Sequence, residues 1–188
     1  MRTDFDEPLA TLGDLLEQRG LHYDLLAVGG GALLLLGLLP RPTKDIDVVG
    51  LVEADDVRFS RDLPEPLARA IGDTALLLGL RSDWLNAGPA SLAELGLPIG
   101  AVKRAVIRDW GSLRLRLASR IDQISFKLYA AVDQGPHSRH FADLRRLAPT
   151  PSELIGAARW ARTHDPSDAF RNELIAALAD LGAVDAEL

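Results

Sequence analysis

The sequence predicts a mixed α/β (α+β) fold, in which a small mixed sheet flanked by helices is followed by a C-terminal helical bundle. Two short apolar segments, residues 23–28 and 45–52, lie on either side of three consecutive glycines and have the composition of strands. Residues 113–118 alternate leucine with arginine, which is typical of a strand with one buried and one solvated face. From Ile121 to the C-terminus, apolar residues recur at helical spacing and prolines separate the helical segments.

The N-terminal half is expected to alternate helices and strands. Leucines three or four residues apart predict a first helix, which Gly20 ends as a C-terminal cap. In chain order, we expect a helix at 9–19, a strand at 23–28, a helix at 32–39 that ends at Pro40 and Pro42, a strand at 45–52, and a helix at 64–80 with Leu67, Ile71, Leu77 and Leu78 inward. Residues 53–62 and 81–98 show no clear period, so we expect loops there.

The second half is expected to begin with two strands, at 101–107 and 113–118, and then to become helical. The predicted helices are one from residue 121 with Ile121, Ile124, Leu128 and Val132 on its inner face, and three more at 137–147, 151–163 and 167–181. The chain therefore divides into a core over residues 1–120 and a C-terminal helical part over 121–188 that packs on the core.

Composition narrows the class of partner. The chain has 188 residues, of which 47% are hydrophobic, and no cysteine, so it can bury a core but has neither a disulfide nor a thiolate metal site. Its longest apolar run, residues 32–39, is too short to span a bilayer, and its N-terminus does not resemble a secretory signal; we expect no membrane partner and a cytoplasmic location. The net charge of -6 argues against a DNA duplex, whereas basic residues between 103 and 146 favour a polyphosphate or an RNA end.

Asp45 and Asp47 form the first candidate site. One residue separates them at the start of a predicted strand, so both side chains are expected on the same face. Two carboxylates this close repel each other. A bound divalent cation resolves the repulsion, and Mg²⁺ typically takes one or two carboxylates together with substrate phosphates.

The glycine run before this strand is a candidate phosphate site. A strand that leads through glycines into a helix presents backbone N–H groups that lack acceptors within the helix. The segment has neither the Gly-Lys-Ser/Thr of a P-loop nor the glycine spacing of a Rossmann fingerprint. The glycines and the carboxylate pair are expected at the same edge of adjacent strands.

Two blocks of residues carry a resemblance to a known family. Gly30-Gly31, then thirteen residues, then Asp45-Ile46-Asp47-Val48 resembles the signature of the DNA polymerase-β-like nucleotidyltransferase superfamily. Arg41 and Thr43 in RPTKDID resemble the Arg-x-Thr/Ser-x-Asp-x-Asp form of its minimal AbiEii/MenT-type members. A second block, Lys127 in ISFKLYAAVDQ and Asp143 in HSRHFADLRRL, is similar to the family's Lys-x-x-Ala helix and the Asp-Leu-x-x-Leu helix after it.

The resemblance implies transfer of a nucleoside monophosphate from an NTP to an acceptor hydroxyl, with release of pyrophosphate and with Mg²⁺ or Mn²⁺ as cofactor. The residues that it assigns to catalysis are Asp45 and Asp47, as metal ligands, with Lys127 and Asp143. Those that it assigns to the nucleotide and its phosphates are Gly30, Gly31, Arg41, Thr43 and Lys127. Asp143 would act either near the metal or by orienting a basic partner.

The minimal members of the family also imply a biological setting. They suggest a toxin of a toxin–antitoxin or abortive-infection system, with a tRNA 3′ end or a protein side chain as acceptor and a cognate antitoxin as partner. Two alternatives stay open. One is nucleotidylation of a small molecule such as an aminoglycoside, and the other is a degenerate module that binds nucleotide or a partner without turnover.

A third metal carboxylate is the least defined part of the expected site. Members of the superfamily often take it from a later strand, and no clear hydrophobic-Asp-hydrophobic strand follows here. Asp83 in LRSDWLN is the best candidate for this ligand. The alternative is that Asp83 is a loop carboxylate that caps a turn.

Overall fold

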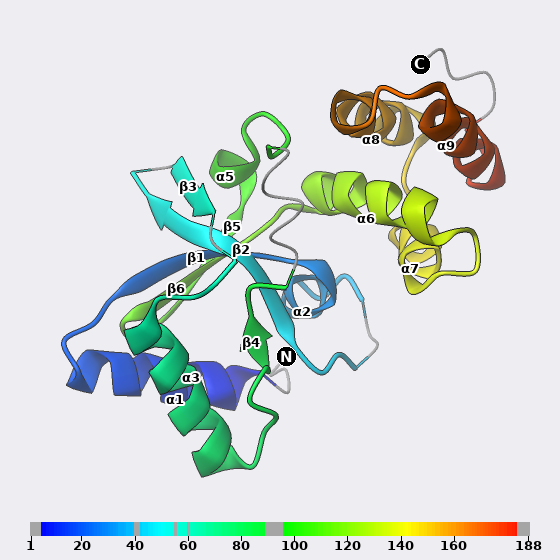
Figure 1. Cartoon of the computed structure of the whole chain (residues 1–188). Helices are drawn as coiled ribbons and strands as arrows, with labels where there is room; N and C mark the ends of the chain where they lie inside the picture. The colour runs from blue at the N-terminus through cyan, green and yellow to red at the C-terminus, as the bar shows by residue number, and fades with distance from the viewer. Residues whose placement is uncertain (1–4, 40–41, 55, 60, 89–95, 184–188) are drawn as a thin grey trace. The chain divides into compact units, whose positions relative to one another are not determined.

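The computed structural model describes residues 5–39, 42–54, 56–59, 61–88 and 96–183. The chain divides into two compact units, Met1–Ser119 and Arg120–Leu188 (Figure 1). The predicted α/β fold class is confirmed, because the first unit contains a mixed sheet flanked by helices and the second contains only helices among its described residues. No helix among the described residues is both long enough and apolar enough to cross a membrane.

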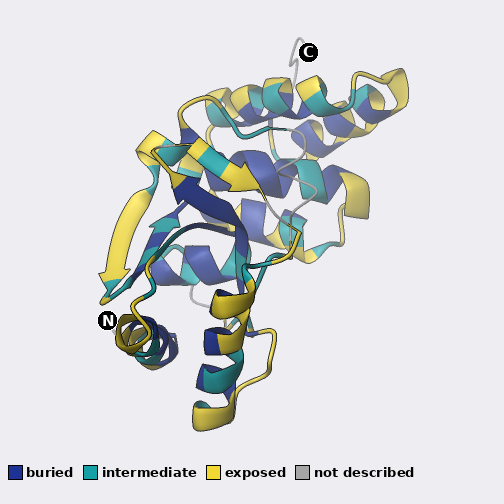
Figure 2. Ribbon diagram, turned by 60° about the vertical axis from the view of Figure 1, so that its left-hand side comes forward, coloured by how far each residue is buried: buried dark blue, intermediate teal, exposed yellow. Residues whose placement is uncertain are grey.

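The sheet of the first unit has six strands in its described part, with β3-β2-β1-β6-β5 as the main order and β4 paired to β2. The strands are β1 (Tyr23–Val28), β2 (Ile46–Glu53), β3 (Asp56–Phe59), β4 (Leu85–Asn86), β5 (Val106–Trp110) and β6 (Leu113–Leu117). β1 is antiparallel to β2 and parallel to β6. The central strands are mostly buried, whereas β5 at the edge is exposed along most of its length (Figure 2).

Helices of the first unit cover the sheet and close its core. They are α1 (Asp6–Gln18), α2 (Gly29–Leu35), α3 (Glu65–Leu78) and the short α5 (Ala101–Arg104). Leucines of α1, including Leu9 and Leu12, pack in one cluster with Leu25 of β1 and Leu115 of β6. In β6 the predicted alternation is confirmed: its leucines are buried and its arginines are half-buried. The two arginines bind carboxylates of neighbouring strands, Arg114 to Asp109 and Arg116 to Asp24.

The second unit is organised around α6. Its helices are α6 (Arg120–Gln134), α7 (Arg139–Leu147), α8 (Pro151–His164) and α9 (Asp168–Asp180), and α6 contacts each of the other three. Side chains cap the helix starts: Ser138 caps α7, Thr150 forms a capping box with Glu153 at α8, and Ser167 caps α9. The guanidinium of Arg120 binds the Glu153 carboxylate and the Leu147 carbonyl, which links the start of α6 to the start of α8.

Three predicted elements of the first unit are wrong. Residues 53–62, expected as loop, contain β3, which pairs antiparallel with β2. The predicted loop at 81–98 contains β4, a two-residue strand that pairs parallel with β2. The strand expected at 101–107 is instead a turn of helix, α5, followed by β5 from Val106. β3 and β5 are mostly exposed edge strands, so their sequences lack the alternation of apolar and polar residues that a buried face produces.

The helix after the glycines also differs from its prediction. It begins at Gly29 instead of Ala32, so all three glycines lie in its first turn. It ends at Leu35 because Gly37, at φ +72°, adopts the left-handed conformation and donates to the Leu34 carbonyl, while Leu38 donates to Leu33. On α3, Leu77 is 67% exposed, because Ala70, Thr74 and Ala75 occupy the inner face with Leu67 and Ile71. Ile121 of α6 is likewise exposed, unlike the rest of its predicted face.

Candidate metal and nucleotide site

The pairing of β1 with β2 brings the glycine turn and the carboxylate pair together. The two strands are antiparallel, and Val28, the last residue of β1, lies opposite Asp47, the second residue of β2. The chain enters α2 directly after Val28, and Asp45 directly precedes β2. Gly29 to Gly31 therefore lie beside Asp45 and Asp47 at one edge of the sheet, as the sequence predicts.

Glycine is required at two positions of this turn. Gly29 has a φ of +74°, and a Cβ built on it would lie 2.9 Å from Oδ2 of Asp47. A Cβ on Gly31 would lie 2.6 Å from the carbonyl oxygen of Asp45 and 2.9 Å from Cα of Ile46. Sequence reasoning selected Gly30 and Gly31 for phosphate contacts and missed Gly29, although it belongs to the same run. Because Gly29 has no side chain, its backbone can lie directly against the Asp47 carboxylate.

Asn86 lies on the other side of Asp47. β4 pairs with β2 so that Asn86 is in register with Asp47, and the Trp84 carbonyl accepts a 2.7 Å hydrogen bond from the backbone N–H of Ile46. A Cβ on Gly88 would lie 2.6 Å from Oδ1 of Asn86 and 2.8 Å from Oδ1 of Asp47, so these two oxygens flank the same small space. The Asn86 amide nitrogen donates to the Asp83 carbonyl at 3.1 Å, which turns its oxygen toward that space. Asn86 could not be predicted from the sequence, because a two-residue strand has no period to detect.

Asp83 is engaged elsewhere. Its carboxylate accepts two hydrogen bonds from the Arg81 guanidinium, at 2.8 Å from Nε and 2.6 Å from Nη2, and both side chains are exposed. The hydrogen bond from Arg81 lowers the pKa of Asp83. The same hydrogen bond is the largest cause that raises the pKa of Arg81, and the negative charges of Asp83 and Asp45 raise it further. Among the described residues no three acidic or histidine side chains form a metal-binding group.

The loop before β2 supports Asp45. The Thr43 hydroxyl lies 3.4 Å from both Oδ1 and the carbonyl oxygen of Asp45 and donates to them. Thr43, predicted to contact nucleotide phosphates, thus orients a predicted metal ligand in this structure. Arg41, the other phosphate-binding candidate of this loop, lies outside the described residues.

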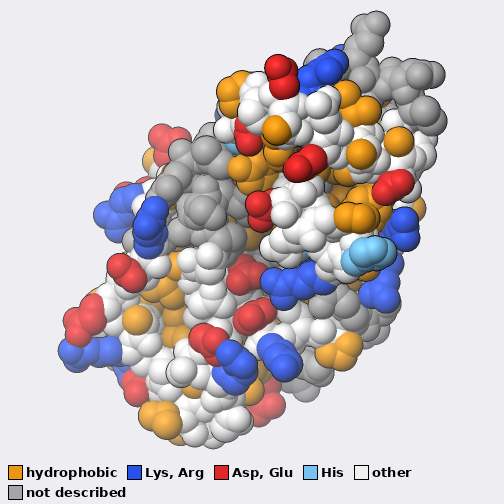
Figure 3. All heavy atoms as spheres, turned by 45° about the vertical axis from the view of Figure 1, so that its right-hand side comes forward, with side chains coloured by type: hydrophobic (Ala, Val, Ile, Leu, Met, Phe, Trp, Pro, Cys, Tyr) orange, Lys and Arg blue, Asp and Glu red, His pale blue; other side chains and the backbone are white. Residues whose placement is uncertain are grey.

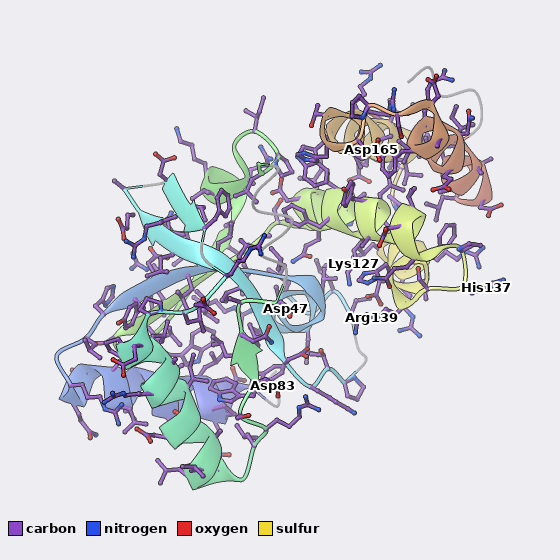
Figure 4. The ribbon with its side chains drawn as sticks, viewed as in Figure 1. Asp47, Asp83, Lys127, His137, Arg139 and Asp165 are labelled. Carbon is purple, nitrogen blue, oxygen red and sulfur yellow. The ribbon has the colours of Figure 1, made fainter. Side chains whose placement is uncertain are left out.

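Lys127 and Asp143 belong to the second unit, where they bind each other. Nζ of Lys127 on α6 donates to Oδ2 of Asp143 on α7 at 2.8 Å, and the two side chains are 5% and 1% exposed. Figure 4 labels Lys127 on α6, with His137 and Arg139 at the turn into α7. Of the two roles expected for Asp143, the structure displays the orientation of a basic partner. Lys127 is buried, unlike a lysine that extends along a helix surface to water.

Asp45, Asp47 and Asn86 offer a set of hard oxygen donors. Two carboxylates and an amide carbonyl suit Mg²⁺ or Mn²⁺, which prefer oxygen ligands and retain positions for water and phosphate oxygens. The glycines on both sides of Asp47 fit this assignment, because any side chain at Gly29 or Gly88 would fill the space next to its oxygens. Arg81 is exposed, and its pKa is raised by Asp83 and also by the negative charge of Asp45. It therefore adds a cation near the same edge.

Comparisons of the chain with protein-family models, with curated proteins and with solved structures find no match.

Proposed function

We propose that this protein is a Mg²⁺- or Mn²⁺-dependent nucleotidyltransferase that transfers a nucleoside monophosphate from an NTP to an acceptor hydroxyl. The observation that carries the proposal is the β1–β2 register, which sets a side-chain-free glycine turn against the Asp47 carboxylate. Gly29 and Gly88 keep side chains out of the space next to the Asp47 carboxylate, and the Asn86 amide oxygen borders the same space. Phosphoryl transfer needs such a space, because it depends on charge neutralisation and positioning more than on covalent chemistry.

The described site residues of the first unit have separate roles in this proposal. Asp45, Asp47 and Asn86 supply oxygen ligands, and Thr43 holds the Asp45 carboxylate in place. A Mg²⁺ or Mn²⁺ held by these ligands would supply positive charge that neutralises the triphosphate. The backbone N–H groups of Gly30 and Gly31, in the first turn of α2, donate to phosphate oxygens. The acceptor oxygen forms its bond to the α-phosphorus as the bond to pyrophosphate breaks, and the hydroxyl proton passes to solvent.

The identity of the acceptor and the setting rest on the resemblance of the motifs. By that analogy, we propose a tRNA 3′ end or a protein side chain as the acceptor and a toxin of a toxin–antitoxin or abortive-infection system as the setting. We also propose that the protein acts in the cytoplasm, where NTPs and these acceptors occur. The expectation that Lys127 contacts the triphosphate stays a prediction from sequence.

Labelled nucleotide tests the proposal directly. The full chain is incubated with Mg²⁺ and each α-³²P-labelled NTP, together with total tRNA, with an aminoglycoside or with no added acceptor, and pyrophosphate release is measured. Label on tRNA or on the protein supports the proposal in its stated form. Label on the aminoglycoside supports the small-molecule alternative. NTP binding without pyrophosphate release for any acceptor contradicts transfer and favours a binding module.

Matched variants separate the metal ligands from their neighbours. Asp47→Asn is expected to lower the rate by about 10³-fold or more, since a ligand that positions the reacting groups is lost. Asn86→Ala is expected to weaken Mn²⁺ binding, which electron paramagnetic resonance measures without any turnover. Asp83→Asn removes one charge from the same loop and is expected to leave Mn²⁺ binding unchanged, because Asp83 binds Arg81. Full activity of Asp47→Asn would rule out the proposed site.

A further inference from the structure

A groove lies on the second unit between the end of α6 and one face of α9. It encloses about 480 Å³, and its lining comes from the last turn of α6, the turn at 135–136, Phe141 of α7 and four residues of α9. The α9 residues are Glu173, Ala176, Ala177 and Asp180, whose spacing of three, one and three places them on one side of the helix. This volume lies in the range of ligand-binding clefts.

Small and apolar side chains give the groove its depth. Ala131 and Val132 of α6 and Ala177 of α9 are buried beneath it, and Phe141 at 1% exposure closes its base. Ala176 is exposed at the wall. Figure 3 shows hydrophobic and acidic side chains next to one another on the helices of this unit. An apolar side chain from outside would therefore find an apolar floor.

The rim of the groove is acidic on both walls. Asp133 stands on the α6 side, and Glu173 and Asp180 stand on the α9 side; all three are exposed. The lining contains no lysine, arginine or histidine. None of the three carboxylates forms an ion pair with a basic side chain in the described part of the chain, where many arginines do bind acids. The negative charge of the rim is therefore available to basic groups of a partner.

Helix ends add to this negative charge. α6 ends at Gln134 and α9 at Asp180, so the carbonyl ends of both helices lie at the groove, and neither last turn carries a basic residue. Asp133 and Asp180 lie in these last turns, where the helix dipole favours a cation over an anion. Folding of this unit alone gains nothing from acids at these positions.

We propose that this groove binds a basic amphipathic helix of a partner protein. Apolar side chains on one stripe of that helix would enter the floor at Ala131, Val132 and Ala177. Lysine or arginine on its flanks would reach the carboxylates of both walls. Helix-in-groove recognition combines these features, with apolar anchors for affinity and complementary charge for selection. The proposal concerns the second unit only and does not depend on nucleotidyl transfer.

A displayed library of random 16-residue peptides provides the probe. The library is first depleted of peptides that bind the Ala176→Trp variant, in which a large side chain fills the groove from an exposed position. Peptides that bind the unmodified full chain are then selected. We expect the enriched peptides to carry two or more basic residues flanking apolar residues at i, i+3 and i+4. Fluorescence anisotropy of an enriched peptide should give a Kd about tenfold higher for the triple variant Asp133→Asn/Glu173→Gln/Asp180→Asn, as loss of partly desolvated ion pairs predicts.

Controls separate the groove from general acidity. Asp168→Asn removes an exposed charge from the same helix outside the groove and should leave the Kd unchanged. Circular dichroism checks that each variant is folded. Acidic or neutral consensus peptides, no enrichment over Ala176→Trp, or a Kd insensitive to the triple variant would each overturn the proposal. Dimerisation of the protein that Ala176→Trp abolishes would assign the groove to a second copy and would equally overturn it.

Discussion

Lys127 and Asp143 form a buried ion pair between α6 and α7. Removing two charges from water costs several kcal/mol, so such a pair contributes little net stability compared with apolar residues of the same volume. Breaking it by removing one partner is different, because a buried charge then loses its counterion. The pair can therefore position a charge for function or fix the helix packing, and these two roles predict different variant behaviour.

Asp143→Leu is expected to lower the free energy of unfolding by about 3–5 kcal/mol, since Lys127 would stay buried beside an apolar side chain. The double variant Lys127→Met/Asp143→Leu should recover most of this loss, as urea unfolding of the full chain can measure. If the double variant is stable but does not transfer nucleotide, Lys127 has a chemical role. If it is stable and fully active, the pair is structural and the sequence-based assignment of Lys127 is wrong.

His164 is a histidine whose ionisation the fold disfavours. It lies at the end of α8 with its ring 4.4 Å from that of Trp160 and 5.9 Å from that of Tyr129, and burial lowers its pKa below 6.5. Between its folded and unfolded pKa values, the unfolded chain binds more protons than the folded one. Stability is therefore fully present above about pH 6.5 and decreases as pH falls toward the folded pKa.

His164→Gln should make the free energy of unfolding less dependent on pH in this range. For the wild type we expect the free energy of unfolding to fall as the pH decreases from about 6.5 toward the folded pKa of His164. Urea unfolding at several pH values measures the slope. Asp83, Asp109, Glu153 and Asp165 have lowered pKa values, so they act at more acidic pH and leave this window clear. An unchanged slope in His164→Gln would show that other groups cause the loss.

At the scale of elements, the close approach of α2 to the start of β2 holds the candidate site together. Gly31→Ala would place a methyl group 2.6 Å from the Asp45 carbonyl oxygen, so α2 or the start of β2 has to move. We expect a loss of about 1–3 kcal/mol in unfolding free energy, typical of overpacking, and weaker Mn²⁺ binding because Asp45 shifts.

Gly72→Ala is the matched control for this substitution. Gly72 lies inside α3 with nothing within 4 Å of a built Cβ. The same substitution there should stabilise the protein by up to about 1 kcal/mol, because alanine favours helix more than glycine does. Equal effects of the two substitutions on stability and on Mn²⁺ binding would show that α2 does not press on β2 as the structure indicates.

Comparison of the predicted and observed elements shows which of them could be predicted from the sequence. β1 was predictable to the residue and β6 to within one, because buried side chains impose a clear pattern on them. β3 and β4 were missed, since an exposed edge strand and a two-residue strand carry no such pattern. Three glycines argue against a helix by propensity, yet α2 begins with them, because a Cβ at Gly29 or Gly31 would lie less than 3 Å from Asp47 or from Asp45 and Ile46.

The candidate site was predictable where it depends on adjacent segments of chain. Asp45, Asp47 and the glycine turn are joined by one helix and one strand pairing, so their proximity follows from local order. Asn86 comes from about forty residues later, through a strand pairing that only tertiary structure reveals. Asp83 was selected as a candidate third ligand because the sequence alone does not show that Arg81, two residues earlier, binds its carboxylate.

At the scale of the whole molecule, the break after Ser119 separates two sets of contacts. The first unit buries its leucines around a sheet, and the second buries them among helices around α6. A substitution in one core should therefore reduce the stability of that unit more than that of the other, because local unfolding follows the contiguous packing of each region. This expectation concerns energetic coupling and can be measured on the full chain.

Hydrogen exchange of two matched variants tests that coupling. Leu154 on α8 and Leu115 on β6 are both fully buried, and replacing either by alanine should cost about 2–5 kcal/mol where the cavity forms. Leu154→Ala is expected to lower amide protection in α6 to α9 by about a hundredfold or more while the amides of β1, β2 and β6 keep theirs. Leu115→Ala should give the reverse pattern. If either variant lowers protection equally in both units, the chain unfolds as one cooperative body, and a ligand bound to one unit would then stabilise the other to the same extent.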